Sequence, residues 1–514
     1  MLDSRIWFAI VCLLPAFAVS YLATAAMRVL SPRWGLVDQP AARKFHRTST
    51  PLGGGIAIWL GVVLPLAAAQ AIAFALSRTE SPEVWIAPEL AVHLDGVWSR
   101  AGLLWGILAA GTLLSVMGLL DDLFNLPWVP RLLVQICVAC GLVAGGVHAT
   151  LFVPWPMVGA VVTALWIIVL INSINFLDNM DGLTSGISLI AACMFAIIML
   201  TSTSEPRWLV AGVLLVLAGS LAGFLGHNWP PARIFMGDTG SYFVGLLLAT
   251  MTVLGTFYES NTGSRHVMLA PLCVLAVPLY DFITVVSIRL SRGLSPFHAD
   301  KNHFSHRLVD LGFTSRNAVL TIHLATLTTG LGGLLLYRVP DWSSAWLVIA
   351  LIACVLAMIA ILETVARHRT QQIQNQATSP ETIAPVRDAG TGNPPRPATP
   401  AQIDAVGPNT WVQREKPAAR MPPHPGAAAV RPLPLRSRVP SPHLYWDCGW
   451  RGCSSLRSRL LRERHSGWFN SHSWWRCSLP GIGRGPGHSP FGGTDGTLPL
   501  PAWPADMSSP PWPS

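Results

Sequence analysis

The residues best placed for chemistry lie between positions 171 and 186, where the chain reads I-N-S-I-N-F-L-D-N-M-D-G-L-T-S-G after about fifteen uninterrupted apolar residues. Two amides and two carboxylates recur there every three residues, as Asn172, Asn175, Asp178 and Asp181. Three residues turn a helix by about 300°, so this set winds around the axis. We therefore expect a helix that ends here, broken near Gly182, with its polar groups entering a pocket. Ionisable groups at membrane depth indicate function by default.

Two further acidic segments follow apolar runs. Asp121 and Asp122 come directly after residues 101–120. Two adjacent carboxylates oppose the dipole of a helix C-terminus, which favours a bound cation over a solvated helix end. Asp238 lies in F-M-G-D-T-G-S, where the flanking glycines let backbone approach a ligand closely. Asp238 is thus a candidate metal ligand, and a tight capped turn is the alternative.

A basic segment follows at residues 296–308, P-F-H-A-D-K-N-H-F-S-H-R-L. Its histidines alone fit a metal site or an ordinary polar loop, but Arg307 favours phosphate or diphosphate binding. Carboxylate and amide oxygens on the other segments suit Mg²⁺ or Mn²⁺. An acidic pocket repels phosphates unless a cation bridges them, so the combination indicates metal-assisted phosphoryl transfer.

Composition places these segments in a membrane protein. The 514 residues are 51% hydrophobic and only 12% charged, which is typical of an all-α polytopic membrane protein. Eleven apolar segments are expected to span, at about 6–27, 53–76, 101–120, 132–150, 156–172, 185–201, 208–225, 240–257, 267–288, 317–337 and 343–366. Gly53-Gly54-Gly55 at the start of the second fits close helix packing.

The distribution of Lys and Arg predicts the orientation. Loops 28–52 and 289–316 are the most basic, so both are expected in the cytoplasm, with the N-terminus outside and the C-terminus inside. All four polar clusters then fall on the cytoplasmic side, where one lipid substrate and one soluble substrate can meet.

The chain changes character near residue 370. We expect a membrane domain at 1–368 and a Pro/Arg/Trp-rich tail at 369–514, which holds 24 of the 42 prolines. Such a segment is typical of disorder, and translation of a wrong reading frame is an open alternative. Most of the net charge of +9 lies in this tail, so we expect no nucleic-acid partner.

These motifs resemble the polyprenyl-phosphate N-acetylhexosamine-1-phosphate transferase family. The resemblance runs from about residue 35 to 313 and is carried by G-L-V-D-Q-P-A-A-R-K-F-H at 35–46, G-L-L-D-D at 118–122, N-S-I-N-F-L-D-N-M-D-G-L at 172–183, F-M-G-D-T-G-S at 235–241 and H-F-S-H-R-L at 303–308. It implies transfer of a sugar 1-phosphate from a UDP-amino sugar to undecaprenyl phosphate, with release of UMP. It also implies Mg²⁺ or Mn²⁺ as cofactor and an active site facing the cytoplasm from the inner (plasma) membrane.

The resemblance assigns roles by position. Asp121, Asp122, Asp178, Asp181 and His303 are expected to be catalytic; Asp238 and Asn175 to hold the metal; and Lys44, His46, Arg131, Asn172, His306 and Arg307 to bind substrate. The chain departs from the family pattern at Asn125, which replaces a common third Asp, at Ser305, which interrupts the His-rich loop, and at Arg131, where many members have Lys.

We call residues 296–308 the His loop. Within the family, this loop favours the type that uses UDP-N-acetylglucosamine in O-antigen, teichoic-acid or other envelope glycan synthesis. The muramoyl-pentapeptide type of peptidoglycan synthesis is the alternative. A multi-pass transporter, which predicts polar groups near the middle of spans, and a catalytically dead relative are the other rivals. A homodimer stays open.

Overall fold

The computed structural model describes residues 2–38, 49–80, 84–86, 94–148, 155–203, 205–255, 265–298 and 302–377. Lys44, His46 and the tail from residue 378 lie outside these ranges, so the expectations for them stay predictions. The helices are α1 (Leu2–Leu30), α2 (Gly54–Leu76), α4 (Leu94–Phe124), α5 (Trp128–Ala144), α6 (Pro156–Leu177), α7 (Leu183–Thr201), α8 (Trp208–Asn228), α9 (Gly237–Gly255), α10 (Ala270–Val274), α11 (Ala276–Ser291), α12 (Phe304–Asp310), α13 (Ser315–Leu336) and α14 (Trp342–Ala377), with short 3-10 helices at Ser31–Trp34 and Arg265–Leu269.

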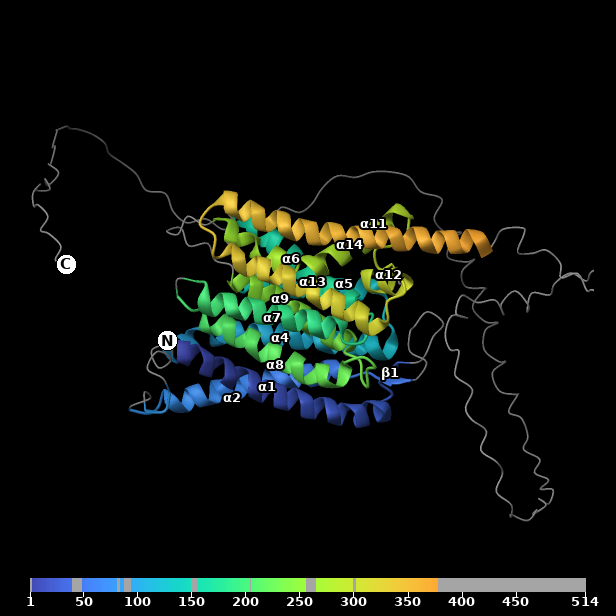
Figure 1. The fold of residues 1–514 in the computed structure, drawn as a ribbon. Coiled ribbons are helices and arrows are strands. Elements are labelled where there is room, and N and C mark those ends of the chain that lie inside the picture. Colours follow the sequence, from blue (N-terminus) through green and yellow to red (C-terminus); the bar gives the residue numbers. More distant parts are fainter. Residues whose placement is uncertain are drawn as a thin grey trace, which may run out of the picture. The chain divides into compact units, whose positions relative to one another are not determined.

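The long helices form a bundle in which they run side by side (Figure 1), and the expectation of an all-α polytopic membrane protein is confirmed. Each of the eleven expected segments overlaps at least one described helix. Eight of the described helices are long and apolar enough to cross a membrane, or nine if α10 and α11, bent by 67° at a break, form one span. Helix α5 is apolar but shorter. The count of eleven and the orientation of the termini stay predictions.

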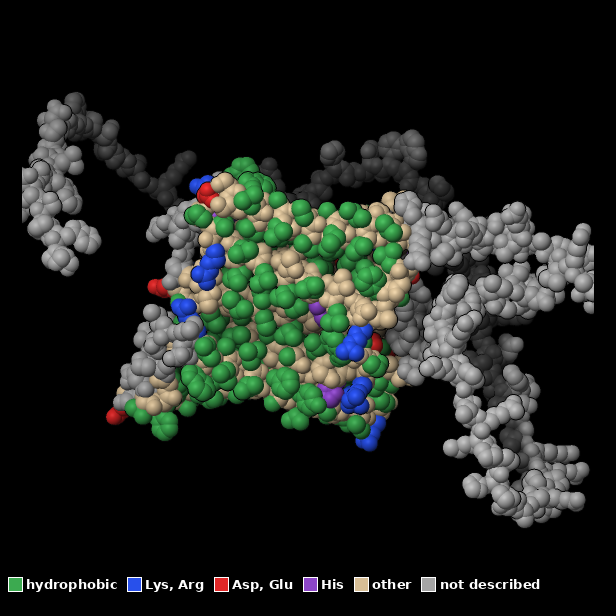
Figure 2. Space-filling model, in the orientation of Figure 1, with side chains coloured by type: hydrophobic (Ala, Val, Ile, Leu, Met, Phe, Trp, Pro, Cys, Tyr) green, Lys and Arg blue, Asp and Glu red, His purple; other side chains and the backbone are tan. Residues whose placement is uncertain are grey.

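The surface of the bundle has the pattern that a bilayer requires. On the face drawn in Figure 2, hydrophobic side chains cover the middle of the helices, and Lys and Arg gather near the two ends. Helical backbone pairs its own N–H and C=O groups, so such an apolar belt can face lipid without unsatisfied polar groups.

Helix α9 is the centre of the bundle, and nearly all of its residues are buried. It contacts α2, α4, α6, α7 and α8. Two of these contacts need glycine, because a Cβ on Gly55 would lie 2.2 Å from the Gly240 nitrogen and one on Gly118 would lie 2.4 Å from the Asp238 carbonyl. The first contact confirms the packing interpretation of Gly53–Gly55. Both fix the N-terminal turn of α9, which carries Asp238.

A short ribbon lies beside this turn. Strands β1 (Val37–Asp38) and β2 (Thr50–Pro51) pair antiparallel, with Val37 opposite Pro51. The carbonyl of Pro51 accepts a hydrogen bond from the Phe235 N–H at 2.9 Å. The ribbon is thereby attached to the backbone that leads into α9.

Candidate active site

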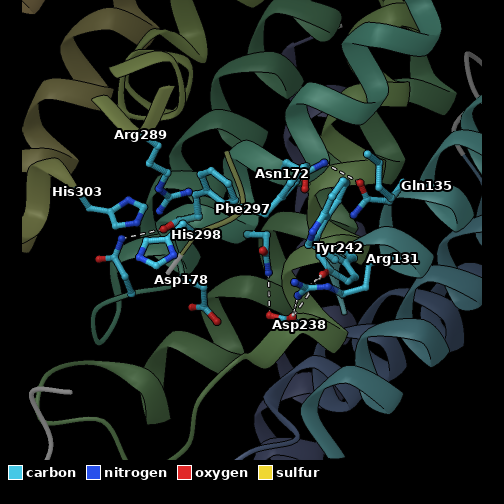
Figure 3. A pocket seen from close by; sticks show the side chains of 15 residues that line it. Arg131, Gln135, Asn172, Asp178, Asp238, Tyr242, Arg289, Phe297, His298 and His303 are labelled. Carbon is cyan, nitrogen blue, oxygen red and sulfur yellow. Dashed lines mark hydrogen bonds and ion pairs between the residues drawn. The ribbon is translucent and has the colours of Figure 1, made fainter. Parts of the chain in front are cut away.

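A cavity of about 270 Å³ lies where α5, α6, α9 and α11 meet the His loop. Figure 3 shows Arg131, Tyr242 and Asp238 on one side of it and Arg289, His298 and His303 on the other. Its lining residues are Trp128, Arg131, Leu132, Gln135, Asn172, Asn175, Phe176, Asp178, Asn179, Asp238, Tyr242, Arg289, Phe297, His298 and His303. Residues from three of the four polar clusters line this cavity, and Asp121 of the fourth cluster contacts the lining residue Arg131. Clusters far apart in sequence therefore gather at one end of the bundle.

The polar end of α6 has the form expected from the sequence. The helix ends at Leu177, and α7 begins at Leu183 after Gly182, whose φ of 73° is left-handed. Asn172 donates to Gln135 Oε1 at 2.6 Å, and Asn175 donates to Asp238 Oδ1 at 2.8 Å. Because the set winds around the axis, Asn172, Asn175 and Asp178 line the cavity, whereas Asp181 is not among the lining residues.

Asp238 and Arg131 line the cavity, and Asp121, which is not among the lining residues, contacts Arg131. Arg131 Nη1 lies 2.5 Å from Asp121 Oδ2 and 3.3 Å from Asp238 Oδ2. Tyr242, one turn along α9, donates its hydroxyl to the same Asp238 oxygen at 3.3 Å. One guanidinium thus bridges two carboxylates from α4 and α9. Arg131 was expected to bind substrate. In this structure its guanidinium forms ion pairs with Asp121 and Asp238.

Three other carboxylates hold the backbone that leads into α9. Asp122 accepts hydrogen bonds from the N–H of Asp238 at 3.0 Å and from the N–H and hydroxyl of Thr239 at 3.2 and 2.8 Å. Asp178 accepts from the Gly237 N–H at 3.1 Å, and Asp181 from the Ala232 N–H at 2.9 Å. Asp122 therefore satisfies the free N–H groups of a helix N-terminus, where a negative charge is stabilised.

The surroundings of Asp178 shift the pKa of its carboxyl group. Burial, with the nearby Asp122 carboxylate as the next cause, raises the pKa of Asp178 to about 7, although the Gly237 hydrogen bond acts in the opposite direction. Desolvation disfavours the charged carboxylate, and a like charge adds to this effect.

The His loop is attached to the bundle by two buried carboxylates. His303 Nδ1 lies 2.9 Å from Asp281 Oδ2, and the Phe304 N–H donates to Asp281 Oδ1 at 2.8 Å. Arg307 forms an ion pair with Glu363 of α14 at 2.5 Å, with both side chains about 95% buried or more. His303 lines the cavity, whereas His306 and Arg307 are not among its lining residues.

Two departures from the family pattern have structural roles. Asn125 follows α4 with a φ of 49°, and Asn is among the few residues that adopt this left-handed conformation readily at a helix C-terminus. Ser305 donates its hydroxyl to Asn179 Oδ1 at 2.6 Å, which ties α12 to the turn after α6.

The sequence analysis did not identify several residues that line the cavity or contact the His loop. Arg289 lies 4.8 Å above the Phe176 ring as a cation–π pair, and Trp128 stacks on Phe297 with 5.0 Å between ring centroids. Asp281 and Glu363 each stand in an apolar segment expected to span the membrane. An isolated carboxylate in such a segment is a signal in its own right, and it would have identified both residues.

The residues present fit a magnesium site with few protein ligands. Among the described residues, no group of three or more His, Cys, Asp or Glu side chains is arranged to hold a metal. The Asp238 carboxylate and the Asn175 amide are in contact, and Arg131 already places a positive group between Asp238 and Asp121. Magnesium is commonly bound by one or two carboxylates, with water and substrate phosphates completing the shell. Asp238 and Asn175 provide such a donor set.

Comparison with known proteins gives consistent matches. The model of glycosyl transferase family 4 matches residues 104–256. The decaprenyl-phosphate N-acetylglucosaminephosphotransferase of Mycobacterium tuberculosis is 32% identical over 374 residues, which cover 68% of this chain and 88% of the relative.

Two more distant relatives match over similar lengths. The probable undecaprenyl-phosphate N-acetylglucosaminyl 1-phosphate transferase of Bacillus subtilis is 30% identical, with 68% of this chain and 91% of the relative covered. The undecaprenyl-phosphate alpha-N-acetylglucosaminyl 1-phosphate transferase of Escherichia coli is 28% identical, with 64% and 85% covered. The matched family segment contains Asp121, Asp122, Arg131, Asn175 and Asp238, the residues that meet at the acidic side of the cavity. The chain therefore belongs to glycosyl transferase family 4.

Proposed function

We propose that this protein transfers N-acetylglucosamine 1-phosphate from UDP-N-acetylglucosamine to a polyprenyl phosphate such as undecaprenyl phosphate, and releases UMP. The reaction would be the first membrane step of cell-envelope glycan synthesis, at the cytoplasmic face of the plasma membrane. The observation that carries the proposal is the cavity itself, which places Asp238, in contact with Asn175, opposite Arg289 and His303 at one end of an apolar bundle. The names of the relatives supply the sugar and the acceptor class.

The proposed reaction forms one bond to phosphorus and breaks another. An oxygen of the polyprenyl phosphate attacks the β-phosphorus of the nucleotide sugar. The bond from that phosphorus to the bridging oxygen breaks, UMP leaves with this oxygen, and the product is a lipid-linked diphosphate sugar. A phosphate monoester is largely ionised near neutral pH, since its second pKa is about 6, so the attack requires little help from a base.

Asp238 and Asn175 are the residues that would hold Mg²⁺. When bound, the ion would neutralise the diphosphate and stabilise the leaving UMP. Arg289 would contact phosphate oxygens from the other side, because cationic donors form short, strong hydrogen bonds with them. The ring of His303 would face the same phosphates. Arg131 would keep Asp121 and Asp238 close together until substrate arrives.

The rival activities predict different placements or substrates. A transporter predicts its polar site near the middle of the spans, whereas this cavity lies at the start of α5 and α9 and at the end of α6. The muramoyl-pentapeptide transferase uses the same chemistry on a larger donor, and only the donor distinguishes it.

The test uses purified full-length protein in detergent with Mg²⁺ and undecaprenyl phosphate. UDP-N-acetylglucosamine, labelled in the sugar, is supplied in one reaction and UDP-N-acetylmuramoyl-pentapeptide in another. We expect sugar label in the lipid fraction and an equal amount of UMP with the first donor only. Transfer with the second donor alone would overturn the proposed substrate, and no transfer with either donor in folded protein would overturn the proposed reaction.

A further inference from the structure

Asp281 is a buried carboxylate that contacts the first residues of the His loop. It lies in α11, a helix of otherwise largely apolar residues, and its exposed fraction is 1%. Its two oxygens are divided between His303 Nδ1 at 2.9 Å and the Phe304 N–H at 2.8 Å. An ionised group is costly at this depth unless it is paired and hydrogen-bonded. The contacts with one imidazole and one backbone N–H offset this cost.

The contact with His303 fixes which ring nitrogen can act in the cavity. His303 is 6% exposed and lines the cavity, and Nδ1 is engaged by Asp281. The edge of the Phe176 ring, 6.1 Å away between centroids at 85°, limits rotation of the imidazole. Nε2 is therefore the nitrogen left to face a ligand. A carboxylate on one imidazole nitrogen sets the tautomer and makes the other nitrogen more basic.

The contact with Phe304 fixes the position of the loop. Phe304 is the first residue of α12, and its N–H is one of the groups that a helix leaves without an internal partner. Asp281 satisfies this group from α11, while Arg307 and Glu363 join the same short helix to α14. Contacts with α11 and α14 thus fix both the position and the orientation of the His303 imidazole.

We propose that Asp281 is a positioning residue for the transfer reaction, which orients His303 so that Nε2 meets the phosphates of the nucleotide sugar. Asp281 itself does not line the cavity, so it acts through His303. The kinetic part of this inference rests on the proposed function, whereas the orientation of His303 does not.

Asp281→Asn is the decisive variant because it keeps the size of the side chain. The amide oxygen can still accept from the Phe304 N–H, which leaves the NH₂ group against His303. Nδ1 must then accept a hydrogen bond, and the ring proton moves to Nε2. We expect kcat/KM to fall about 10- to 100-fold, the range found when the outer partner of a metal-bound histidine is removed. Asp341→Asn, the same exchange at the exposed start of α14, is the matched control.

A double-mutant comparison separates positioning from general damage. If Asp281 acts through His303, adding Asp281→Asn to His303→Ala should change kcat/KM by less than about twofold. An equal loss from Asp281→Asn in both backgrounds would overturn the proposal.

Nitrogen NMR of protein labelled at the histidine rings gives a readout that needs no activity. His303 is identified by the signal that disappears in His303→Ala. We expect a proton on Nδ1 in the native protein and its absence there in Asp281→Asn. Nδ1 without a proton in the native protein, or the same state in both, would contradict the proposal. Inactivity of the native protein with every donor would instead count against the proposed function, and the NMR result would still decide the role of Asp281.

Discussion

On the side of the cavity formed by α4, α9 and the turn after α6, carboxylates accept hydrogen bonds from backbone N–H groups and from Arg131. On the side formed by α11 and α12, cationic or basic groups are held by carboxylates, as in His303 with Asp281 and Arg307 with Glu363. We call these the acidic wall (Asp178 and Asp238, which line the cavity, with Asp121 and Asp122, which contact Arg131 and the backbone of α9) and the basic wall (Arg289 and His303). Contacts with hydrogen-bond donors or oppositely charged groups on other elements reduce the cost of placing such groups at membrane depth.

The difference shows how one cavity can accept both a cation and a diphosphate. The acidic wall holds more carboxylates than cations, which favours a divalent ion. The basic wall turns Arg289 and His303 toward the same space, which favours phosphate oxygens. The comparison also separates carboxylates that face the cavity from carboxylates that hold the backbone. Four single substitutions test the roles given to residues of the two walls and to the residues that support them.

The largest effect is expected at the centre of the acidic wall. Asp238→Ala removes the carboxylate that would hold Mg²⁺, and metal ions stabilise charge in transition states by several kcal/mol, so transfer should fall by about 10³-fold or more. UMP release under saturating Mg²⁺ measures it, with Asp341→Asn as control. A variant that keeps a tenth of the native rate would remove Asp238 from this role.

The next effect concerns the ion pair behind the basic wall. Arg307→Ala leaves the Glu363 carboxylate buried without its main partner, which should lower the free energy of unfolding by about 3–5 kcal/mol. Denaturant unfolding in detergent measures the change.

The paired exchange Arg307→Met with Glu363→Leu should recover much of this stability, because the two buried charges are removed together. If Arg307→Ala keeps native stability and loses UDP binding, Arg307 binds substrate, as the sequence alone suggested.

A smaller loss of stability is expected from the acidic wall. Asp122→Ala removes the acceptor for the N–H groups of Asp238 and Thr239, and an unsatisfied buried donor costs about 1–3 kcal/mol. Thermal unfolding of the variant and of Asp341→Asn measures the difference. Lost transfer with unchanged unfolding would give Asp122 a direct part in the chemistry.

The smallest effect is expected at the hydrogen bond that joins α12 to the turn after α6. Ser305→Ala removes the hydrogen bond to Asn179, worth about 1 kcal/mol. Transfer should remain within about fivefold of native, since 1.4 kcal/mol corresponds to tenfold. Loss of all transfer would mean that the Ser305 hydroxyl contacts substrate.

Sequence reasoning succeeded where local pattern determines local structure. The spacing of Asn172 to Asp181 predicted the helix end and the break at Gly182, and the order of the polar segments predicted that they meet at one end of the bundle. The family resemblance assigned Asn175 and Asp238 to one metal site, and their side chains are in direct contact; the metal itself stays a prediction.

It missed contacts with partners far away in the chain. Glu363, 56 residues after Arg307, forms an ion pair with it, and the expectation that Arg307 binds substrate stays a prediction. The bend of 67° between α10 and α11 is hidden in one continuous apolar segment. Lys44 and His46 lie outside the described residues, so their expected contacts with substrate stay predictions.

The most direct test of the two-walled cavity is the linkage between Mg²⁺ and UDP. Calorimetric titration of UDP into the native protein and into Asp238→Asn, each with Mg²⁺ and with a chelator, gives four affinities. If an ion on Asp238 joins the diphosphate to the acidic wall, Mg²⁺ should tighten UDP binding at least about tenfold in the native protein, a coupling of the usual allosteric size, and leave the variant unchanged. Equal tightening in both proteins, or none in the native protein, would contradict the account.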